Sequence, residues 1–284
     1  MEFSHKIAFV IPCYNDGRFI RSAIESAERS EVTPAEIVIV DNGSDDEGTK
    51  SVMDELAAAG YRVIHHEGGG PAGARNAGIA ASTAEYVIPL DSDNKIRQDF
   101  VKKAVDILDA RREISVVHSD FQYFGLSDHV CYIEPFDVRK MLYINYIDTC
   151  SVFRRDVWEE CGGFDESEEL RGIEDWEFWL NAYSHGKRFL HLDMIGFDYA
   201  WREDSLSSRT KKPEYWRRAE QRLYSKHVML LKEHYRIYHT WDYHGSELRR
   251  RPVRTLFRLF LNALSKRAHD RIYRIRNAEN PQEG

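Results

Sequence analysis

The chain has 284 residues, of which 42% are hydrophobic and 31% are charged, and its formal net charge at pH 7 is −7. This length and apolar content suit one large α/β domain, or one domain with an appendage. The acidic balance argues against a nucleic-acid-binding protein. The sequence contains no run of about 18 apolar residues, so it predicts no transmembrane helix.

Four cysteines form no C-x-x-C pair: Cys13, Cys131, Cys150 and Cys161. A chain of this size does not need a disulfide framework, so we expect reduced, buried thiols. The apolar run at 6–11 is too short for a signal peptide and is followed by a polar turn. We therefore expect a cytoplasmic protein, with peripheral contact to the inner face of a membrane as an open alternative.

The first 120 residues alternate between strand and helix patterns. Short, β-branched apolar runs predict strands at 6–11, 36–40, 61–64, 85–90 and 114–118. Helical spacing of apolar residues predicts helices over 19–29, 49–59, 72–81 and 99–110. This alternation predicts a Rossmann-like α/β fold, in which a mostly parallel central sheet is flanked by helices. Ligands of such sheets bind at the carboxyl ends of the strands.

The pattern changes after residue 120. An amphipathic helix is predicted over 175–183, strands over 188–192 and 195–201, and helices from residue 213 onward. We therefore divide the chain into an α/β domain of residues 1–210 and a helical C-terminal extension of residues 211–284. The α/β domain itself has two halves, residues 1–120 and 121–210.

Polar, turn-forming residues follow three of the predicted strands, at 12–16, 41–44 and 91–93. Each cluster alone is also ordinary turn chemistry, but together they favour one binding crevice. Asp91-Ser92-Asp93 is the sharpest of them. Carboxylates at i and i+2 of an extended chain point the same way, so both could reach one Mg²⁺ or Mn²⁺ ion, which prefers oxygen ligands. A solvated acidic turn is the alternative.

Six motifs occur along the chain: 11–15 (IPCYN), 37–44 (IVIVDNGS), 73–79 (GARNAGI), 90–93 (LDSD), 162–166 (GGFDE) and 174–175 (ED). Their order and spacing resemble a family 2 glycosyltransferase of the GT-A fold, over roughly residues 5–207. The resemblance implies a nucleotide-sugar-binding half at 1–120 and an acceptor and catalytic half at 121–210. It also implies a Mn²⁺ or Mg²⁺ cofactor.

The resemblance implies a donor site composed of Pro12, Tyr14, Asn15, Asp41, Asn42, Arg75, Asp91, Ser92 and Asp93. Asp41 would contact the nucleoside, and Arg75 would lie near the diphosphate or nucleoside. Asp93 would bind the metal, with Asp91 near the ribose or metal. Asp175 would be the catalytic base.

Asp175 opens the predicted aromatic-rich helix, and a helix N-terminus favours the ionised carboxylate that a base requires. Charge complementarity at the start of a helix is the alternative reading of Glu174-Asp175. Glu174, Trp176 and Thr149, the last within the segment Asp148-Thr149-Cys150-Ser151, are weaker candidates for the acceptor site. For Trp176, core packing is the alternative.

Arg202 departs from the pattern, because family members often carry a histidine there that can bind the metal. A guanidinium does not ligate a metal, but it can bind phosphate oxygens bidentately. We therefore expect Arg202 to contact the diphosphate and the metal to have fewer protein ligands.

Two other functions are considered. The segment 68–73 contains G-x-G-x-x-G, which is found in flavin and nicotinamide oxidoreductases. However, it follows the third predicted strand, with three residues intervening; a flexible loop over the donor site is the alternative. A protein that binds nucleotide sugars without turnover is the other function.

We expect a glycosyltransferase that moves a hexosyl or N-acetylhexosaminyl group with inversion. The donor would be a UDP-sugar, with dTDP and GDP open, and the acceptor a glycan or a lipid-linked glycan. The pathway would be synthesis of a cell-surface polysaccharide, a glycolipid or a glycoprotein glycan. A basic, amphipathic stretch at 249–276 would lie on a membrane, or pack on the body or on a second subunit of a homodimer.

Overall fold

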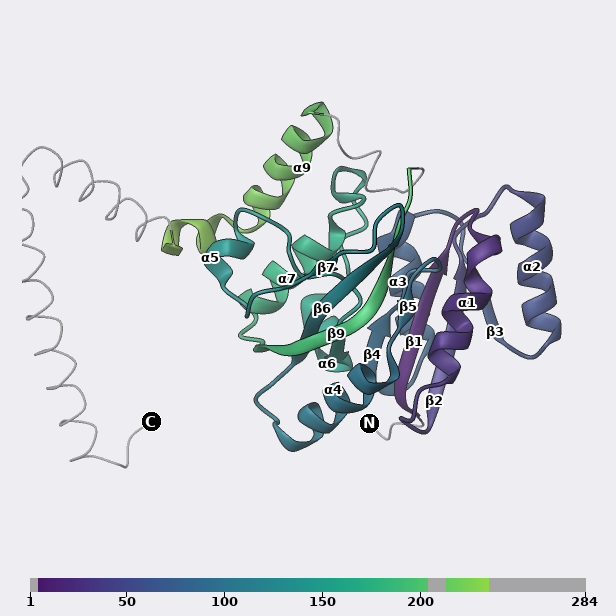
Figure 1. The fold of residues 1–284 in the computed structure, drawn as a ribbon. Coiled ribbons are helices and arrows are strands. Elements are labelled where there is room, and N and C mark those ends of the chain that lie inside the picture. Colours follow the sequence, from purple (N-terminus) through teal and green to yellow (C-terminus); the bar gives the residue numbers. More distant parts are fainter. Residues whose placement is uncertain (1–4, 204–212, 235–284) are drawn as a thin grey trace, which may run out of the picture. The chain divides into compact units, whose positions relative to one another are not determined.

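The computed structural model describes residues 5–203 and 213–234 (Figure 1). The chain divides into two compact units, Met1–Val228 and Met229–Gly284, and the fold below is that of the first. The boundary that we predict at 210/211 and the basic stretch at 249–276 both lie outside the described residues. In the described part, no helix is both long and apolar enough to cross a membrane.

One sheet runs through the described part of the first unit, in the order β3-β2-β1-β4-β8-β6-β9-β5, with β7 paired to β6. Its strands are β1 His5–Cys13, β2 Ala35–Asp41, β3 Arg62–His65, β4 Ala84–Pro89, β5 Lys95–Ile96, β6 Val116–Gly125, β7 Val130–Cys131, β8 Val152–Arg154 and β9 Phe189–Trp201. The helices are α1 Gly17–Glu28, α2 Glu47–Ala58, α3 Gly70–Ala81, α4 Gln98–Ala110, α5 Val138–Met141, α6 Arg155–Cys161, α7 Glu174–Ser184 and α9 Pro213–Lys226, with a 3-10 turn η1 at Glu168–Leu170.

The sheet is parallel in its first half and mixed in its second. β1 lies between β2 and β4 and is parallel to both, and β2 is parallel to β3. β8 is antiparallel to β4 and β6, whereas β9 is parallel to β6. The carboxyl ends of β1, β2 and β4 therefore meet at one edge of the sheet, as predicted for an α/β fold.

Helices cover both faces of β1, which explains its unbroken apolar run. Ile7 and Phe9 join one core with Ile20 of α1 and Phe100 of α4. In the view of Figure 1, α1 and α4 lie in front of the sheet and α3 behind it.

On the other face, α3 approaches the sheet at Gly78. A Cβ atom there would lie 2.4 Å from Cγ1 of Val10 and 3.0 Å from Cγ2 of Val40. Only a glycine lets the helix and the strands come so close. This contact sets the position of α3, whose first turns carry Arg75.

The predicted strands at 188–192 and 195–201 are one strand, β9. Its register against β6 shifts around Ser119, Asp120 and Phe121. A bulge of this kind interrupts the two-residue alternation of side chains, which explains why the sequence pattern read as two strands.

Candidate active site

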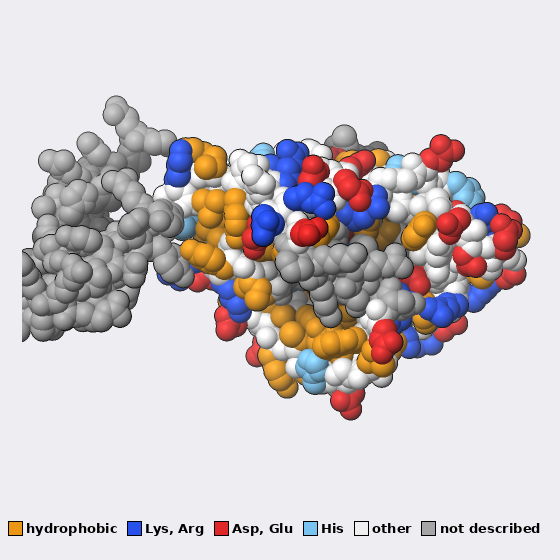
Figure 2. Space-filling view, turned by 90° about the horizontal axis from the view of Figure 1, so that it is seen from above, with side chains coloured by type: hydrophobic (Ala, Val, Ile, Leu, Met, Phe, Trp, Pro, Cys, Tyr) orange, Lys and Arg blue, Asp and Glu red, His pale blue; other side chains and the backbone are white. Residues whose placement is uncertain are grey.

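A cavity of about 770 Å³ opens at the carboxyl ends of β1, β2 and β4. Figure 2 looks onto this edge of the sheet, where acidic and basic side chains lie next to one another beside groups of hydrophobic ones. Most of the predicted site residues line the cavity: Pro12, Tyr14, Asn15, Asn42, Arg75, Asp91, Ser92, Asp93, Thr149, Glu174, Asp175 and Arg202. Asp41 and Trp176 are the predicted site residues that do not.

Asn15 ties together the loops that follow β1 and β2. Its backbone has a positive φ of 55°, and its Oδ1 accepts hydrogen bonds from the backbone N–H groups of Asp45 and Asp46, at 3.0 and 3.1 Å. Its own backbone N–H donates to Ser44 Oγ at 3.1 Å. The neighbouring Tyr14 is 49% exposed, so its ring is accessible to a base or sugar.

Asp41 lies behind this part of the wall. One carboxylate oxygen accepts a hydrogen bond from the Ser44 N–H at 3.1 Å, and the other lies 3.1 Å from Nδ1 of His65. Asp41 therefore shapes the loop that presents Asn42. Its direct contact with a nucleoside stays a prediction.

Asp91-Ser92-Asp93 forms a turn, so our expectation of an extended chain is wrong. The Asn94 N–H donates to the Asp91 carbonyl at 3.0 Å, because the chain must reverse after β4 to reach β5. The Asn94 side chain accepts a hydrogen bond from the Ala200 N–H at 2.9 Å and so fixes this turn to β9. The two carboxylates meet different arginines.

Arg75 of α3 joins two of the motifs. Its guanidinium donates to Oδ1 of Asp91 at 2.8 Å and to Oε1 of Glu174. Burial opposes its positive charge, but the two carboxylates prevail and raise the pKa of Arg75. Arg75 therefore fastens the turn after β4 to the start of α7.

Arg202 lies at the other carboxylate of the turn. Its guanidinium is 2.9 Å from Oδ2 of Asp93, donates to both oxygens of Asp16 at 3.0 Å, and lies over the Phe19 ring at 4.4 Å. Asp16 ends the polar cluster at 12–16, which was the one sequence signal for it. The guanidinium thus occupies the surroundings of Asp93 where the family pattern often has a histidine.

The turn fits a hard cation. Burial and the neighbouring Asp91 raise the pKa of Asp93 to about 6, so a positive charge there would be favourable. The arginines pair with one oxygen of each carboxylate, which leaves the second oxygen of each able to meet a cation. No cluster of three or more metal-ligating side chains occurs within 5–203 and 213–234. The rest of the shell would therefore come from phosphate or water.

Asp175 lies in the first turn of α7. Its Oδ1 accepts a hydrogen bond from the Trp176 N–H at 2.8 Å, and its Oδ2 accepts one from Nδ2 of Asn145 at 3.0 Å. Burial, reinforced by Glu174, raises the pKa of Asp175 to about 7. A carboxylate that titrates near neutral pH can act as a general base.

Asp148, which we include with Thr149 as a weak acceptor candidate, is a third carboxyl group in this wall. Burial, with Asp91 nearby, raises its pKa to about 8, and its Oδ1 accepts a hydrogen bond from the Cys150 N–H at 2.8 Å. The cavity is also lined by Cys13, Asp16 and Gly43 of the predicted polar clusters and by Gly68, Gly70 and Pro71 of the glycine-rich segment. The lining residues that we did not predict are Arg171, Gly172, Tyr199 and Ala200.

Trp176 does not line the cavity. Its side chain is 2% exposed, and its indole N–H donates to the Met141 carbonyl. The structure places Trp176 in the core, which was the alternative to an acceptor contact. Its indole thus reaches the end of α5, and the ring centroid lies 6.3 Å from that of Trp216 in α9.

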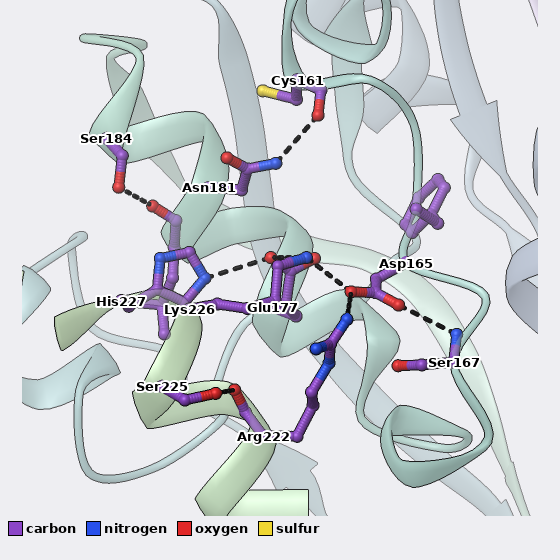
Figure 3. A network of polar contacts seen from close by, with 12 residues as sticks. Cys161, Asp165, Ser167, Glu177, Asn181, Ser184, Arg222, Ser225, Lys226 and His227 are labelled. Atoms are coloured by element: carbon purple, nitrogen blue, oxygen red, sulfur yellow. Dashed lines mark hydrogen bonds and ion pairs between the residues drawn. The ribbon is translucent and has the colours of Figure 1, made fainter.

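Figure 3 shows the polar contacts that join the end of α9 to α7 and to Asp165. The fully buried Glu177 of α7 lies 2.8 Å from Nζ of Lys226 and 3.1 Å from Nε2 of His227. Asp165 contacts both Lys226 and Arg222. These ion pairs place α9 within the first compact unit, although it belongs to the C-terminal extension in our division of the chain.

The glycine-rich segment 68–73 forms part of the cavity wall. Gly68 and Gly70 line the cavity, and a Cβ atom on Gly70 would lie 2.8 Å from Nε of Arg171. Gly68, Gly69 and Gly70 have positive φ angles of 86°, 87° and 65°, a backbone conformation that glycine adopts readily. This backbone role explains the glycines of the G-x-G-x-x-G pattern, so the pattern does not require a bound dinucleotide.

The chain matches the model of glycosyl transferase family 2 over residues 8–162. It therefore belongs to this family, and the oxidoreductase alternative is wrong. Among curated proteins it is similar to EpsJ of Bacillus subtilis (strain 168), described as an uncharacterized glycosyltransferase. The two are 26% identical over 226 residues, which cover 73% of this chain and 64% of EpsJ.

Two solved structures share the fold. The chain resembles S. aureus TarS 1–349 in complex with UDP-GlcNAc with a TM-score of 0.62 and 21% identity, covering 75% of this chain and 64% of TarS 1–349. It resembles the mannosyltransferase PcManGT from Pyrobaculum calidifontis, in complex with GDP-Man and Mn²⁺, with a TM-score of 0.55 and 19% identity, covering 72% and 62%. These matches establish the GT-A fold. The chain spans less than two thirds of the length of each of these three proteins.

Proposed function

We propose that this protein is a glycosyltransferase that moves a sugar from a nucleoside diphosphate sugar to an acceptor hydroxyl. One observation carries the proposal. A single cavity holds a carboxylate pair suited to a cation, an arginine at that pair, and a half-buried carboxyl group, Asp175, whose pKa is raised to about 7. Transfer of a sugar needs these three functions together.

The reaction would proceed by direct displacement. Asp175 would take the proton of the acceptor hydroxyl as its oxygen forms a bond to the anomeric carbon. The bond between that carbon and the diphosphate oxygen breaks, and its electron pair leaves with the diphosphate. Attack from the face opposite the leaving group gives inversion.

The negative charge that develops on the leaving diphosphate would be stabilised at the turn after β4. Asp93, with Asp91 beside it, would hold Mn²⁺ or Mg²⁺, whose chemistry is to offset the charge that develops on the diphosphate. Arg202 lies close enough to Asp93 to turn from that carboxylate to the phosphate oxygens. Arg202 would thus exchange one anion for another when the donor binds.

A UDP-sugar is the donor that we place first, with GDP- and dTDP-sugars next. Solved proteins of this fold are bound to UDP-GlcNAc and to GDP-Man, which fits a hexosyl or N-acetylhexosaminyl group. The acceptor would be a glycan or a lipid-linked glycan in the synthesis of a cell-surface polysaccharide, glycolipid or glycoprotein glycan. The enzyme would act in the cytoplasm, with membrane contact or a second subunit engaging the basic stretch at 249–276.

A donor screen tests the proposal. Purified protein is incubated with UDP-, GDP- and dTDP-sugars in the presence of Mn²⁺, Mg²⁺ or a chelator, and release of the nucleoside diphosphate is measured. We expect turnover with one nucleotide class, and its loss with the chelator. Asp175→Asn should lower turnover by about 100-fold or more, in the range of a lost general base, whereas Asp54→Asn on the exposed surface of α2 should not.

The outcomes separate the two functions that are still open. Nucleotide-sugar binding by calorimetry with no release of product under any condition would favour a binding protein without turnover. Turnover that persists in Asp175→Asn would exclude Asp175 as the base.

A further inference from the structure

The segment from the end of α5 to β8 is hydrogen-bonded to α7 on both sides of Asn145. Upstream, the indole N–H of Trp176 donates to the Met141 carbonyl. Downstream, the indole N–H of Trp179 donates to the Ile147 carbonyl at 3.1 Å. Both tryptophans are buried. The backbone around Asn145 therefore has a fixed position relative to the helix that carries Asp175.

Asn145 contacts Asp175 directly. Its Nδ2 donates to Oδ2 of Asp175 at 3.0 Å, while the Trp176 N–H donates to Oδ1 at 2.8 Å. The carboxylate is thus held by one donor from its own helix and one from the loop. Each oxygen keeps a further lone pair, so the group can still receive a proton.

The carbonyl oxygen of the Asn145 side chain does not contribute to the stability of the protein. This Oδ1 atom is buried and has no hydrogen-bond partner among the described residues. A buried carbonyl without a partner destabilises a protein, and a leucine of similar size would not have that defect. An amide at this position therefore indicates that its N–H group, which faces Asp175, has a function.

Charged groups face Asp175 from three elements. Glu174 on α7 and Asp148 on the loop favour its protonated form, whereas Arg75 on α3 favours the ionised form. Asn145 acts with Arg75, since it donates a hydrogen bond that is strongest to a carboxylate.

We propose that Asn145 is a positioning residue for Asp175, which keeps the carboxylate ionised and turned toward the acceptor hydroxyl. This role rests on the proposed function, in which Asp175 is the general base. It predicts that loss of the amide impairs proton transfer and not donor binding.

The test compares Asn145→Leu with Asn181→Leu. Asn181 lies on α7, outside the cavity. Like Asn145, it donates a hydrogen bond from Nδ2, in this case to the Cys161 carbonyl at 2.9 Å. Asn145→Leu should raise the apparent pKa of the acid limb of the pH–rate profile by about one unit, lower kcat about fivefold at pH 7, and regain rate toward pH 9. The KM for the donor should change less than about twofold. Asn145→Gln, which keeps an amide donor, should recover part of the rate.

A second measurement does not depend on turnover. Carboxyl ¹³C NMR titration of the aspartates, with Asp175 assigned through Asp175→Asn, should show a higher midpoint in Asn145→Leu and an unchanged one in Asn181→Leu. Asn145→Ala gives the same test if leucine does not fit. An active wild type is needed for the proposed function but not for this titration. An unchanged midpoint in a folded Asn145 variant, or an equal change in Asn181→Leu, overturns the role of Asn145.

Discussion

At the scale of single residues, the cavity wall concentrates carboxyl groups that retain protons near neutral pH. Burial raises the pKa of Asp175 to about 7 and that of Asp148 to about 8, each reinforced by a neighbouring carboxylate. One group that releases its proton near pH 7 can serve as a base, while a neighbour that keeps its proton can donate a hydrogen bond to a sugar hydroxyl. The two adjacent environments thus favour different roles.

Asp148 also makes stability depend on pH. Its pKa is about 8 in the folded protein and 3.8 as a free side chain. Between these values the native state binds a proton that the unfolded state releases, so the free energy of unfolding falls as pH rises from about 4 to 8. Asp148→Asn removes this dependence and can keep the hydrogen bond from Cys150. The Tm of Asp148→Asn minus the Tm of the wild type, measured by scanning calorimetry, should therefore be larger at pH 8.5 than at pH 5. The same Tm difference at both pH values would contradict this.

Arg202→Ala tests the exchange of partners at the turn after β4. Loss of the guanidinium removes a phosphate contact, so nucleotide affinity should fall by about tenfold or more, which corresponds to one charge-assisted hydrogen bond. Titration calorimetry with UDP measures it. Arg21→Ala on α1, which removes an exposed pair with Glu55, serves as the matched control. Unchanged nucleotide affinity in Arg202→Ala would show that Arg202 pairs only with carboxylates.

Sequence motifs predicted more of the residues on the donor side of the cavity than on the acceptor side. Residues 12–16, 41–44 and 91–93 follow strands, and parallel strands end at one edge, so local patterns indicate that they meet. Asn145 and Asp175 are 30 positions apart, and their contact depends on how a loop packs against α7. No local pattern encodes such a contact, and this is why Asn145 was not predicted.

At the scale of elements, tight packing of α3 fixes the position of Arg75. Gly78→Ala would place a Cβ atom 2.4 Å from the stiff side chain of Val10. Overpacking costs about 1–3 kcal/mol and the gain in helix propensity is about 1 kcal/mol, so we expect a net loss of up to about 2 kcal/mol. Gly48→Ala on α2, where the nearest atom is 3.5 Å away, should instead be neutral or stabilising. Urea denaturation compares the two, and equal effects would contradict tight packing at α3.

Long elements were predictable and short ones were not. The strands and helices of the first half repeat their apolar pattern over several residues, and the structure places an element at each predicted position. The ends shift by one or two residues, except in β6, which runs from Val116 to Gly125 where the strand is predicted to end at 118. β5 and β7 have two residues each, which is too short for any period. Their pairing depends on β9 and β6, and hence on tertiary structure.

At the scale of the whole molecule, a ligand in the cavity bridges both halves of the first unit. Residues 1–120 supply the turn after β4, while residues 121–210 supply Asp175 and Arg202. Binding should therefore stabilise the unit as one body. UDP with Mn²⁺ at about 100 times its Kd should add about 2.7 kcal/mol, which a thermal-shift assay detects. A chelator should remove most of this stabilisation. An equal stabilisation by UDP with and without the chelator would argue against a cation at Asp93.

Arg75 has a consequence for the order of events in the cavity. One guanidinium contacts Asp91, at the donor end, and Glu174, the neighbour of Asp175. A cation that draws the charge of Asp91 to itself leaves Arg75 more strongly paired with Glu174, and so alters the field at Asp175. By thermodynamic linkage, protonation of Asp175 must then alter cation affinity to the same degree. In the proposed mechanism, the two ends of the cavity would thus be coupled through a single side chain, and binding of the donor with its cation would change the pKa of Asp175.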